Sequence, residues 1–320
     1  MYRIALIALL AALVVPVAGA RSTDGSISIV AYSTPKAAFT TIIPAFNQTA
    51  AGKDVSFTQS YGPSADQANA VVNGLPADVV DLSLEPDMRT LVKAGLVAPT
   101  WNANKYKGIV THSVVVIVFR SGNPKHIRSW NDLIKPGVQV LTPNPVTSGG
   151  ARWNVLAAYG AQLKLGKTPK QAEQYLRTLF KHVVVQDKSA RDALNTFLAG
   201  KGDALLTYEN EALLAQRSGQ PVYFNIPKAT IRIDNPIAVT SKNKPEAQAF
   251  LRYLYTPAAQ KLFAQSGYRP VVKVATKGYS FPVRPQQFTV DYLGGWAKVE
   301  KRFFDPNTGL ITKIEKSLGG

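Results

Sequence analysis

Three junctions between a predicted strand and a predicted helix carry serine, alanine or glycine where the helix begins. Ser64 precedes one helical pattern, Ser148-Gly149-Gly150 precedes a second, and Ser189-Ala190 precedes a third. The first turn of a helix leaves backbone N–H groups unpaired and carries a partial positive charge, so it binds an anion without any cationic side chain. Glycine also lets an anion approach the backbone closely. The three junctions are therefore candidate donors to a small anion.

Each junction also has a purely structural interpretation, because serine is a common N-terminal cap of helices. A lone cap does not need two glycines, so Ser148-Gly149-Gly150 is the strongest of the three candidates. For Ser64 and Ser189, the choice between capping and anion binding stays open at this point.

The residues that enzymes use most often are scarce or badly spaced. His112, His126 and His182 lie far apart without the spacing of metal ligands, and the chain has no cysteine nucleophile. Glu209 and Glu211 begin a predicted helix and point to different sides, so we interpret them as a solvated first turn that complements the helix dipole. No nucleotide-binding glycine pattern is present. We predict a protein that is not an enzyme and uses no cofactor and no metal.

Strand and helix patterns alternate in the part of the chain that contains Ser64. The predicted elements are a strand over 26–31, a helix over 34–46, a strand over 55–59, a loop over 60–64, a helix over 65–73 and a strand over 77–82. Such alternation is typical of a mostly parallel sheet covered by helices.

The same alternation returns after a long apolar strand over 113–119, which we interpret as the first crossing into a second lobe. The predicted elements are a short helix over 130–133, strands over 138–141, 183–186, 204–207 and 237–240, and helices over 151–163, 171–180, 191–199, 247–255, 257–265 and near 296–303. In open α/β sheets, ligands bind beyond the carboxyl ends of the strands. We therefore expect the site in a cleft between two lobes.

The first twenty residues have the pattern of an export signal. Arg3 precedes an apolar stretch that is too short to span a bilayer, and Ala18-Gly19-Ala20 resembles a signal-peptidase site. We predict cleavage after Ala20 and release into a periplasm. The absence of cysteine removes both a disulfide framework and the thiol of a lipid anchor.

The chain is strongly basic, with a formal net charge of +17. Nucleic-acid binding needs clustered basic residues, whereas the longest basic run here is Lys301-Arg302. We predict no nucleic-acid partner. A dispersed basic surface would instead attract small anions by diffusion.

Four stretches resemble the periplasmic sulfate-binding (sulfate and thiosulfate) protein family of ABC transporters. They are VVNGLPADVVDLSLEPD from Val71, SGNPKHIRSWNDLIKPGVQVLTPNPVTSGGARWNVLAAYGA from Ser121, YENEALLA from Tyr208 and FLRYLYTPAAQKLFAQSGYRP from Phe250. The resemblance extends to about Gly295. Its Trp-Asn-Asp-Leu-Ile-Lys-Pro-Gly and Ser-Gly-Gly-Ala-Arg-Trp-Asn blocks are too long to arise by chance.

The resemblance implies a two-lobed periplasmic binding protein of type II, the venus-flytrap α/β class, with mostly parallel sheets in each lobe and two interdomain crossings. It implies a monomer that passes sulfate to the membrane permease of an ABC importer. The expected division is a signal peptide over 1–20, lobe 1 over 21–113, lobe 2 over 114–235, and a return to lobe 1 with a C-terminal packing segment over 236–320.

The resemblance also implies how a dehydrated sulfate is held. The expected N–H donors are Ser64, Gly149, Gly150 and Ala190, with hydroxyl donors from Ser148 and Tyr208. Arg152 and Arg191 would support the binding loops, and Ser33 stands at a further supporting position.

Two positions depart from the family pattern. Tyr208 stands where the family has a tryptophan, and Ser33 stands where it tends to have an aspartate after the tyrosine that ends the first strand. A tyrosine hydroxyl both donates and accepts, whereas a site made only of donors rejects a protonated oxyanion by leaving its hydroxyl unpaired. Thiosulfate, molybdate, arsenate and phosphate therefore remain alternative ligands.

A carrier of ferric iron or of an organic acid is a further alternative for the same fold. Tyr32, Tyr61 and Tyr208 could approach one another across the cleft as iron ligands. The positive helix starts disfavour a metal cation at that place.

Overall fold

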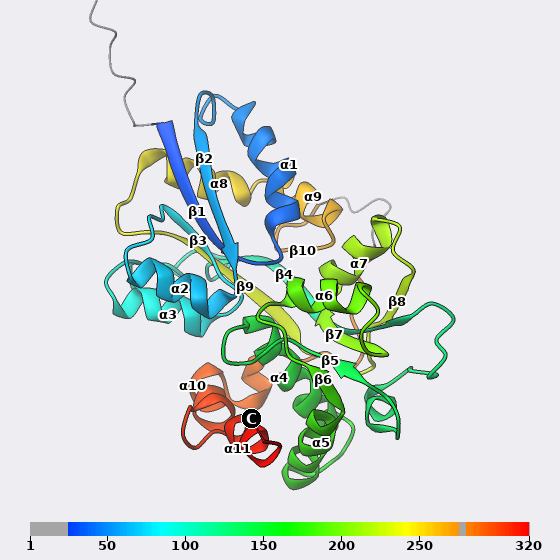
Figure 1. Cartoon of the computed structure of the whole chain (residues 1–320). Helices are drawn as coiled ribbons and strands as arrows, with labels where there is room; N and C mark the ends of the chain where they lie inside the picture. Colours follow the sequence, from blue (N-terminus) through cyan, green and yellow to red (C-terminus); the bar gives the residue numbers. More distant parts are fainter. Residues whose placement is uncertain (1–24, 275–279, 320) are drawn as a thin grey trace, which may run out of the picture.

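The computed structural model describes residues 25–274 and 280–319. The predicted signal peptide and its cleavage after Ala20 lie outside the described residues. Strands follow the order β2-β1-β3-β9-β4-β7-β5-β6, with β8 and β10 (Arg269–Pro270) also paired to β4. Figure 1 shows two lobes, one above the other, joined by this continuous path of strands.

The first lobe is built on a sheet in which the first three strands are parallel. The strands are β1 (Ser26–Tyr32), β2 (Ser56–Gly62), β3 (Val79–Asp81) and the antiparallel β9 (Arg232–Val239). The helices are α1 (Lys36–Asn47), α2 (Ser64–Val72), α3 (Glu85–Lys93), α8 (Pro245–Leu254) and α9 (Pro257–Gln265). Aromatic side chains such as Phe39, Phe46 and Phe250 fill the core on one face, and Met88 and Leu91 contribute to the core on the other.

The second lobe repeats this arrangement around a smaller sheet. Its strands are β5 (Val140–Leu141), β6 (Val183–Val185), β7 (Ala204–Tyr208) and β8 (Val222–Asn225). Its helices are the 3-10 helix η2 (Trp130–Ile134), α4 (Gly149–Lys164), α5 (Pro169–His182), α6 (Ala190–Leu198) and α7 (Glu209–Arg217). Strand β5 pairs in parallel with β6 and β7.

Two strands connect the lobes. Strand β4 (Ile109–Arg120) pairs with β9 through its first half and with β7 and β8 through its second half. Strand β9 pairs with β3 near its end, which returns the chain to the first lobe. The predicted two-lobed α/β class is confirmed, while the residue bounds given above for each lobe stay a prediction.

The C-terminal segment packs against the second lobe. It comprises η3 (Val290–Leu293), α10 (Trp296–Val299), the π-helical turn η4 (Glu300–Phe304) and α11 (Leu310–Ser317). The ring of Trp296 lies 4.9 Å from that of Trp153, and the ring of Phe303 lies 4.8 Å from that of Tyr159, as measured between centroids. This segment lies beside α4 and α5 (Figure 1).

The structure differs from the sequence-based elements in a few places. Strand β2 continues through Gly62, so the expected loop over 60–64 is mostly strand. The patterns do not predict β8, α11 or α3. In α3, Pro86 stands in the first turn. The N–H groups of a first turn have no partner within the helix, so a proline there costs no hydrogen bond.

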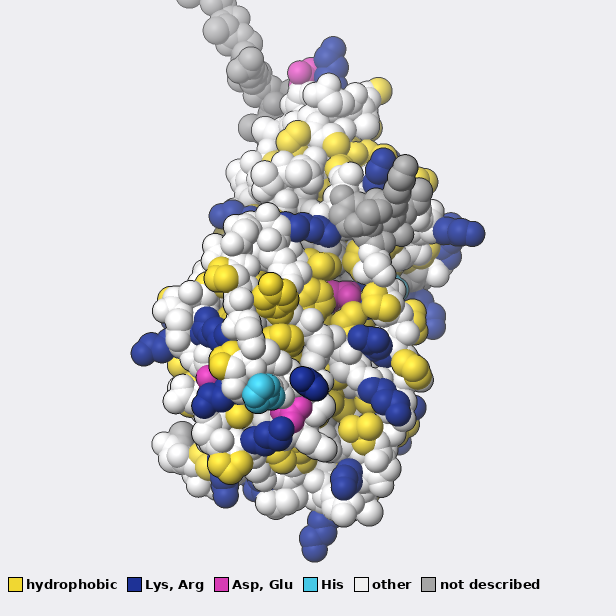
Figure 2. All heavy atoms as spheres, turned by 90° about the vertical axis from the view of Figure 1, so that its right-hand side faces the viewer, with side chains coloured by type: hydrophobic (Ala, Val, Ile, Leu, Met, Phe, Trp, Pro, Cys, Tyr) yellow, Lys and Arg dark blue, Asp and Glu magenta, His cyan; other side chains and the backbone are white. Residues whose placement is uncertain are grey.

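Figure 2 shows lysine and arginine scattered singly over the face that it presents, with fewer acidic side chains between them. The positive excess therefore does not gather on this face into the stripe that nucleic-acid tracking requires. Within residues 25–274 and 280–319, no helix combines the length and apolar character of a membrane crossing.

Candidate anion-binding site

A small pocket lies where the two lobes meet. Its lining residues are Tyr32, Ser33, Pro63, Ser64, Ser83, Ser148, Gly149, Gly150, Ala190 and Tyr208. The cavity volume is only about 10 Å³, which is close to the space for one water-sized sphere. None of these side chains is charged. The pocket brings together every predicted ligand-binding residue and Ser33, whereas Arg152 and Arg191 are not among its lining residues.

The starts of α4 and α6 place unpaired backbone donors at the edge of this pocket. Ser148 caps α4 by accepting from Ala151 N–H at 3.4 Å, and Ser189 caps α6 by accepting from Asp192 N–H at 3.1 Å. Within the described chain, the N–H groups of Gly149, Gly150 and Ala190 have no hydrogen-bond partner. The side-chain caps therefore leave these three N–H groups unpaired, so capping at these helix starts does not exclude anion binding.

The two glycines of α4 permit close packing at the pocket, Gly149 across the lobe boundary and Gly150 within the second lobe. A Cβ atom on Gly149 would lie 2.3 Å from Oγ of Ser83, and one on Gly150 would lie 2.8 Å from Cε2 of Tyr208. Both distances are shorter than any contact that packed carbon atoms tolerate. A side chain at Gly149 would hold the lobes apart, whereas one at Gly150 would clash with Tyr208 inside the second lobe.

Ser64 differs from its expected place, because it begins α2 and does not precede it. The N-cap is Pro63, so the interpretation of Ser64 as a side-chain cap is wrong. Its hydroxyl donates to the carboxylate of Asp87 at 2.5 Å and accepts from the Ser83 N–H at 3.0 Å. Burial raises the pKa of Asp87 to about 6, although the Ser64 hydrogen bond and Arg152 lower it. With its hydroxyl engaged, Ser64 can offer its N–H to a ligand.

Ser83 is a pocket residue that the sequence patterns do not single out. Its hydroxyl lies 2.6 Å from the hydroxyl of Tyr208, and either oxygen could be the donor. Its carbonyl accepts from Nε1 of Trp153 at 2.9 Å and from Nδ2 of Asn235 at 3.2 Å. One signal could have found it, because Ser83 follows a predicted strand at the sheet edge where the other candidates lie.

Tyr208 is neutral in this environment. Its side chain is buried and its ring centroid lies 6.1 Å from that of Tyr32. Burial raises the pKa of the Tyr208 hydroxyl well above its ordinary value. The phenol therefore keeps its proton at neutral pH and retains a donor.

The prediction of a solvated first turn at Glu209 and Glu211 is wrong. The two residues are only 1 % and 0 % exposed. Arg191 donates to both carboxylate oxygens of Glu211 at 2.6 and 2.7 Å, and Arg269 donates to both oxygens of Glu209 at 2.6 and 3.0 Å. Bidentate pairing offsets the desolvation of each carboxylate. Because Arg191 follows Ala190, its ion pair fixes the start of α6 against α7.

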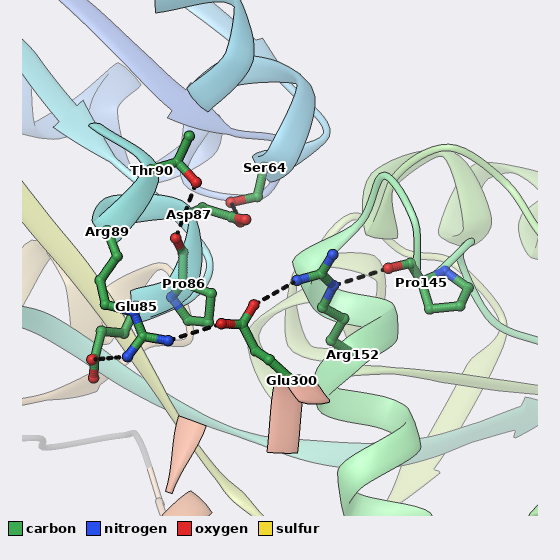
Figure 3. A network of polar contacts seen from close by, with 9 residues as sticks. All are labelled: Ser64, Glu85, Pro86, Asp87, Arg89, Thr90, Pro145, Arg152 and Glu300. Carbon is green, nitrogen blue, oxygen red and sulfur yellow. Dashed lines mark hydrogen bonds and ion pairs between the residues drawn. The ribbon is translucent and has the colours of Figure 1, made fainter. Parts of the chain in front are cut away.

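Arg152 is anchored on the outer side of the pocket. Its Nε donates to the carbonyl of Pro145 at 3.0 Å, and its Nη1 lies 3.4 Å from Oε1 of Glu300 (Figure 3). Neither Arg152 nor Arg191 faces the cavity, so a supporting role for them stays a prediction.

The tyrosines of the iron alternative do not converge. Tyr32 and Tyr208 line the pocket, whereas Tyr61 donates to Oε1 of Gln59 and is not a lining residue. In the part of the chain that the structure describes, no group of three or more histidine or acidic residues could hold a metal ion.

Comparisons with known proteins agree with this architecture. A family model described as bacterial extracellular solute-binding protein matches residues 27–269. A sulfate-binding protein of Synechococcus elongatus is 42 % identical over 307 residues, which cover 92 % of this chain and 87 % of the relative. A sulfate-binding protein of Escherichia coli is 40 % identical over 284 residues, covering 83 % and 84 %. A thiosulfate-binding protein of Pseudomonas aeruginosa is 34 % identical, covering 79 % and 80 %.

Among solved structures, the sulfate-binding protein SubI from Mycobacterium tuberculosis superposes with a TM-score of 0.84. It is 44 % identical, and the match covers 88 % of this chain and 99 % of SubI. The periplasmic binding protein AfuA from Actinobacillus pleuropneumoniae has a TM-score of 0.67 at 16 % identity, covering 93 % and 99 %. The second likeness concerns the fold alone.

Proposed function

Since this chain belongs to the sulfate-binding family of ABC-transporter solute-binding proteins, we propose that it captures sulfate in the pocket between its lobes and delivers it to a membrane permease. Solute-binding proteins of this family carry their ligand without chemical change, and the chain is not an enzyme. A periplasmic location, with a signal peptide removed after Ala20, belongs to the same proposal.

The observation that carries the proposal is the convergence of three helix starts on one buried pocket without a charged lining residue. Each helix start acts as roughly half a positive charge, so α2, α4 and α6 together offset about 1.5 of the two negative charges of sulfate. The N–H groups of Ser64, Gly149, Gly150 and Ala190 would donate to its oxygens. Sulfate offers only acceptors, which suits a site rich in donors.

The Ser148 hydroxyl would add a further donor. Its oxygen accepts from Ala151 N–H, and its proton has no acceptor within the described residues. The closed pocket is too small for an ion to enter, so binding requires the lobes to separate about β4 and β9 and then to close. The permease would recognise the closed form.

Calorimetry on a pair of cap variants tests the proposal. Ser148→Ala removes a helix cap and a donor to the anion, so sulfate affinity should fall roughly 10- to 100-fold. Thr168→Ala removes the cap of α5, remote from the pocket, where Thr168 accepts from Gln171 N–H. Both variants should lose about 1 kcal/mol of stability, but only Ser148→Ala should lose affinity. Equal sulfate affinity in both would refute the proposed site.

The Ser83–Tyr208 contact favours a second candidate function, the binding of singly protonated oxyanions such as hydrogen phosphate. The two hydroxyls share one hydrogen bond, which leaves one proton to donate and lone pairs to accept. A backbone N–H cannot accept the hydroxyl of such a ligand, whereas this pair can. The pair would therefore weaken the preference for sulfate over phosphate.

Competition between sulfate and phosphate distinguishes the two candidates. In Ser83→Ala/Tyr208→Phe, sulfate loses one donor, whereas hydrogen phosphate loses a donor and its acceptor. The ratio of sulfate to phosphate affinity should therefore rise by roughly tenfold, as expected for one buried unpaired hydroxyl. An unchanged ratio would remove the basis for the second candidate.

A further inference from the structure

Glu300 links two arginines that come from different lobes. Its Oε2 accepts from Nη2 of Arg89 at 2.9 Å, while its Oε1 lies 3.4 Å from Nη1 of Arg152. Figure 3 shows the Glu300 carboxylate lying between the two guanidinium groups. Arg89 also pairs with Glu85 at 3.0 Å on its own helix.

The contact between Arg89 and Glu300 crosses the lobe boundary. Arg89 lies on α3, which packs on α2 and β9 of the first lobe. Glu300 lies on η4 of the C-terminal segment, which is held on the second lobe by Trp296 and Phe303. Separation of the lobes would carry Arg89 away from Glu300, whereas Arg152 on α4 would move with Glu300.

Both arginines stand on helices that also hold the pocket. Arg152 follows Gly149 and Gly150 within the first turn of α4. Helix α3 carries Asp87, which accepts from the Ser64 hydroxyl at 2.5 Å. The bridge that Glu300 makes between Arg89 and Arg152 therefore acts on the relative position of the anion donors without touching the anion.

We propose that Glu300 is a positioning residue, an ionic clasp that fastens the lobes in their closed, ligand-holding state. The proposal rests on the proposed function, because closure is what retains the anion. Glu300 begins a π-helical turn that continues α10. Single π turns interrupt the regular helical register and occur often at functional positions.

The clasp is exposed enough to be weak and sensitive to salt. The side chains of Arg89 and Glu300 are 40 % and 35 % exposed. Such pairs typically change an equilibrium by about two- to fivefold and are screened as ionic strength rises. We expect the dissociation rate of sulfate to rise by this factor in Glu300→Gln, with the association rate unchanged, because the clasp forms only on closure.

A matched control lies on the same C-terminal segment. Glu173 of α5 pairs with Arg302 of η4 at 2.8 Å, and their side chains are 35 % and 45 % exposed. This pair joins the C-terminal segment to the second lobe and crosses no lobe boundary. Glu173→Gln therefore removes the same charge without removing a link between the lobes.

Closure itself can be measured between two spin labels on the full mature chain. The chain has no cysteine, so Asn73→Cys on the first lobe and Lys181→Cys on the second introduce the only thiols, both at exposed positions. Pulsed electron resonance then gives the distance distribution with and without sulfate. At low salt, Glu300→Gln should lower the ratio of closed to open molecules about two- to fivefold relative to the parent, which is the labelled chain with Glu300 intact. Addition of 0.5 M NaCl should lower this ratio more in the parent than in Glu300→Gln, because salt screens the ion pair.

The outcomes separate the clasp from the proposed function. Equal distance distributions for the parent and Glu300→Gln under all conditions, or an equal shift in Glu173→Gln, would overturn the clasp. In a double-mutant cycle, Arg89→Met and Glu300→Gln together should change the closed-to-open equilibrium by less than the sum of their separate effects. If sulfate moved the labels in no variant while the ligand-free distributions still differed, the clasp would stand and the proposed function would fall.

Discussion

Replacement of Asp87 by asparagine should remove a pH-dependent loss of stability. Asp87 is only 6 % exposed, and burial raises its pKa from 3.8 to about 6. Each unit corresponds to about 1.4 kcal/mol, so the ionised carboxyl destabilises the fold by about 3 kcal/mol relative to the protonated one. Asparagine is neutral at every pH and can still accept from the Ser64 hydroxyl.

The direction of the effect follows from proton binding. Because the pKa is higher in the folded chain than in the unfolded chain, the folded chain holds more protons between about pH 4 and pH 6. The contribution of Asp87 to the free energy of unfolding is therefore full below about pH 4 and is lost as pH rises through 6. We expect the stability of Asp87→Asn minus that of the natural chain to grow by roughly 2.5 kcal/mol from pH 4 to pH 7.5, because part of the contribution is already lost at pH 4.

Urea unfolding of the anion-free protein between pH 4 and 8 measures this difference, in which all other titrating groups cancel. Asp66→Asn, which removes an exposed carboxyl from the first turn of α2, is the matched control. A flat difference for Asp87→Asn would refute the reasoning. A difference that shrinks as pH rises would show that the carboxylate stabilises the fold.

Two further variants test the packing around the pocket. Arg191→Met leaves the buried carboxylate of Glu211 unpaired, so urea unfolding should show a free energy of unfolding lower by roughly 3 kcal/mol. This value is at the lower end for a buried pair because the Arg191 side chain is still 26 % exposed. Arg191→Met/Glu211→Leu should recover most of the lost stability, and an equal loss in the single and the double variant would contradict the pairing of Arg191 with Glu211. Gly149→Ala places a methyl group 2.3 Å from Oγ of Ser83, so calorimetry should show sulfate affinity reduced roughly 5- to 100-fold. Gly149→Ala/Ser83→Gly should regain affinity, and full affinity in the single variant would contradict the close contact.

The helix starts were predictable from the sequence because their signals are local. A capping serine followed by two glycines marks the start of α4, and Ser189 marks that of α6, each within a few residues. The alternation of strands and helices predicts the two-lobed class for the same reason. Neighbouring residues suffice for such inferences.

The remaining contacts join residues that are distant in the chain. Glu209 meets Arg269 across 60 positions, and Glu300 meets Arg89 across 211. No periodicity or spacing marks such pairs, so the glutamates at the start of α7 resemble any solvated first turn. Ser64 resembled a cap because its partner, Asp87, lies on another helix.

The most direct test of the central claim is calorimetric titration of the anion-stripped mature protein with sulfate, followed by thiosulfate, molybdate and phosphate. We predict one sulfate bound per chain, with affinity reduced roughly 10- to 100-fold in Ser148→Ala and retained in Thr168→Ala. If sulfate did not bind, the assignment of this pocket to sulfate would be contradicted, whether or not another oxyanion bound in its place.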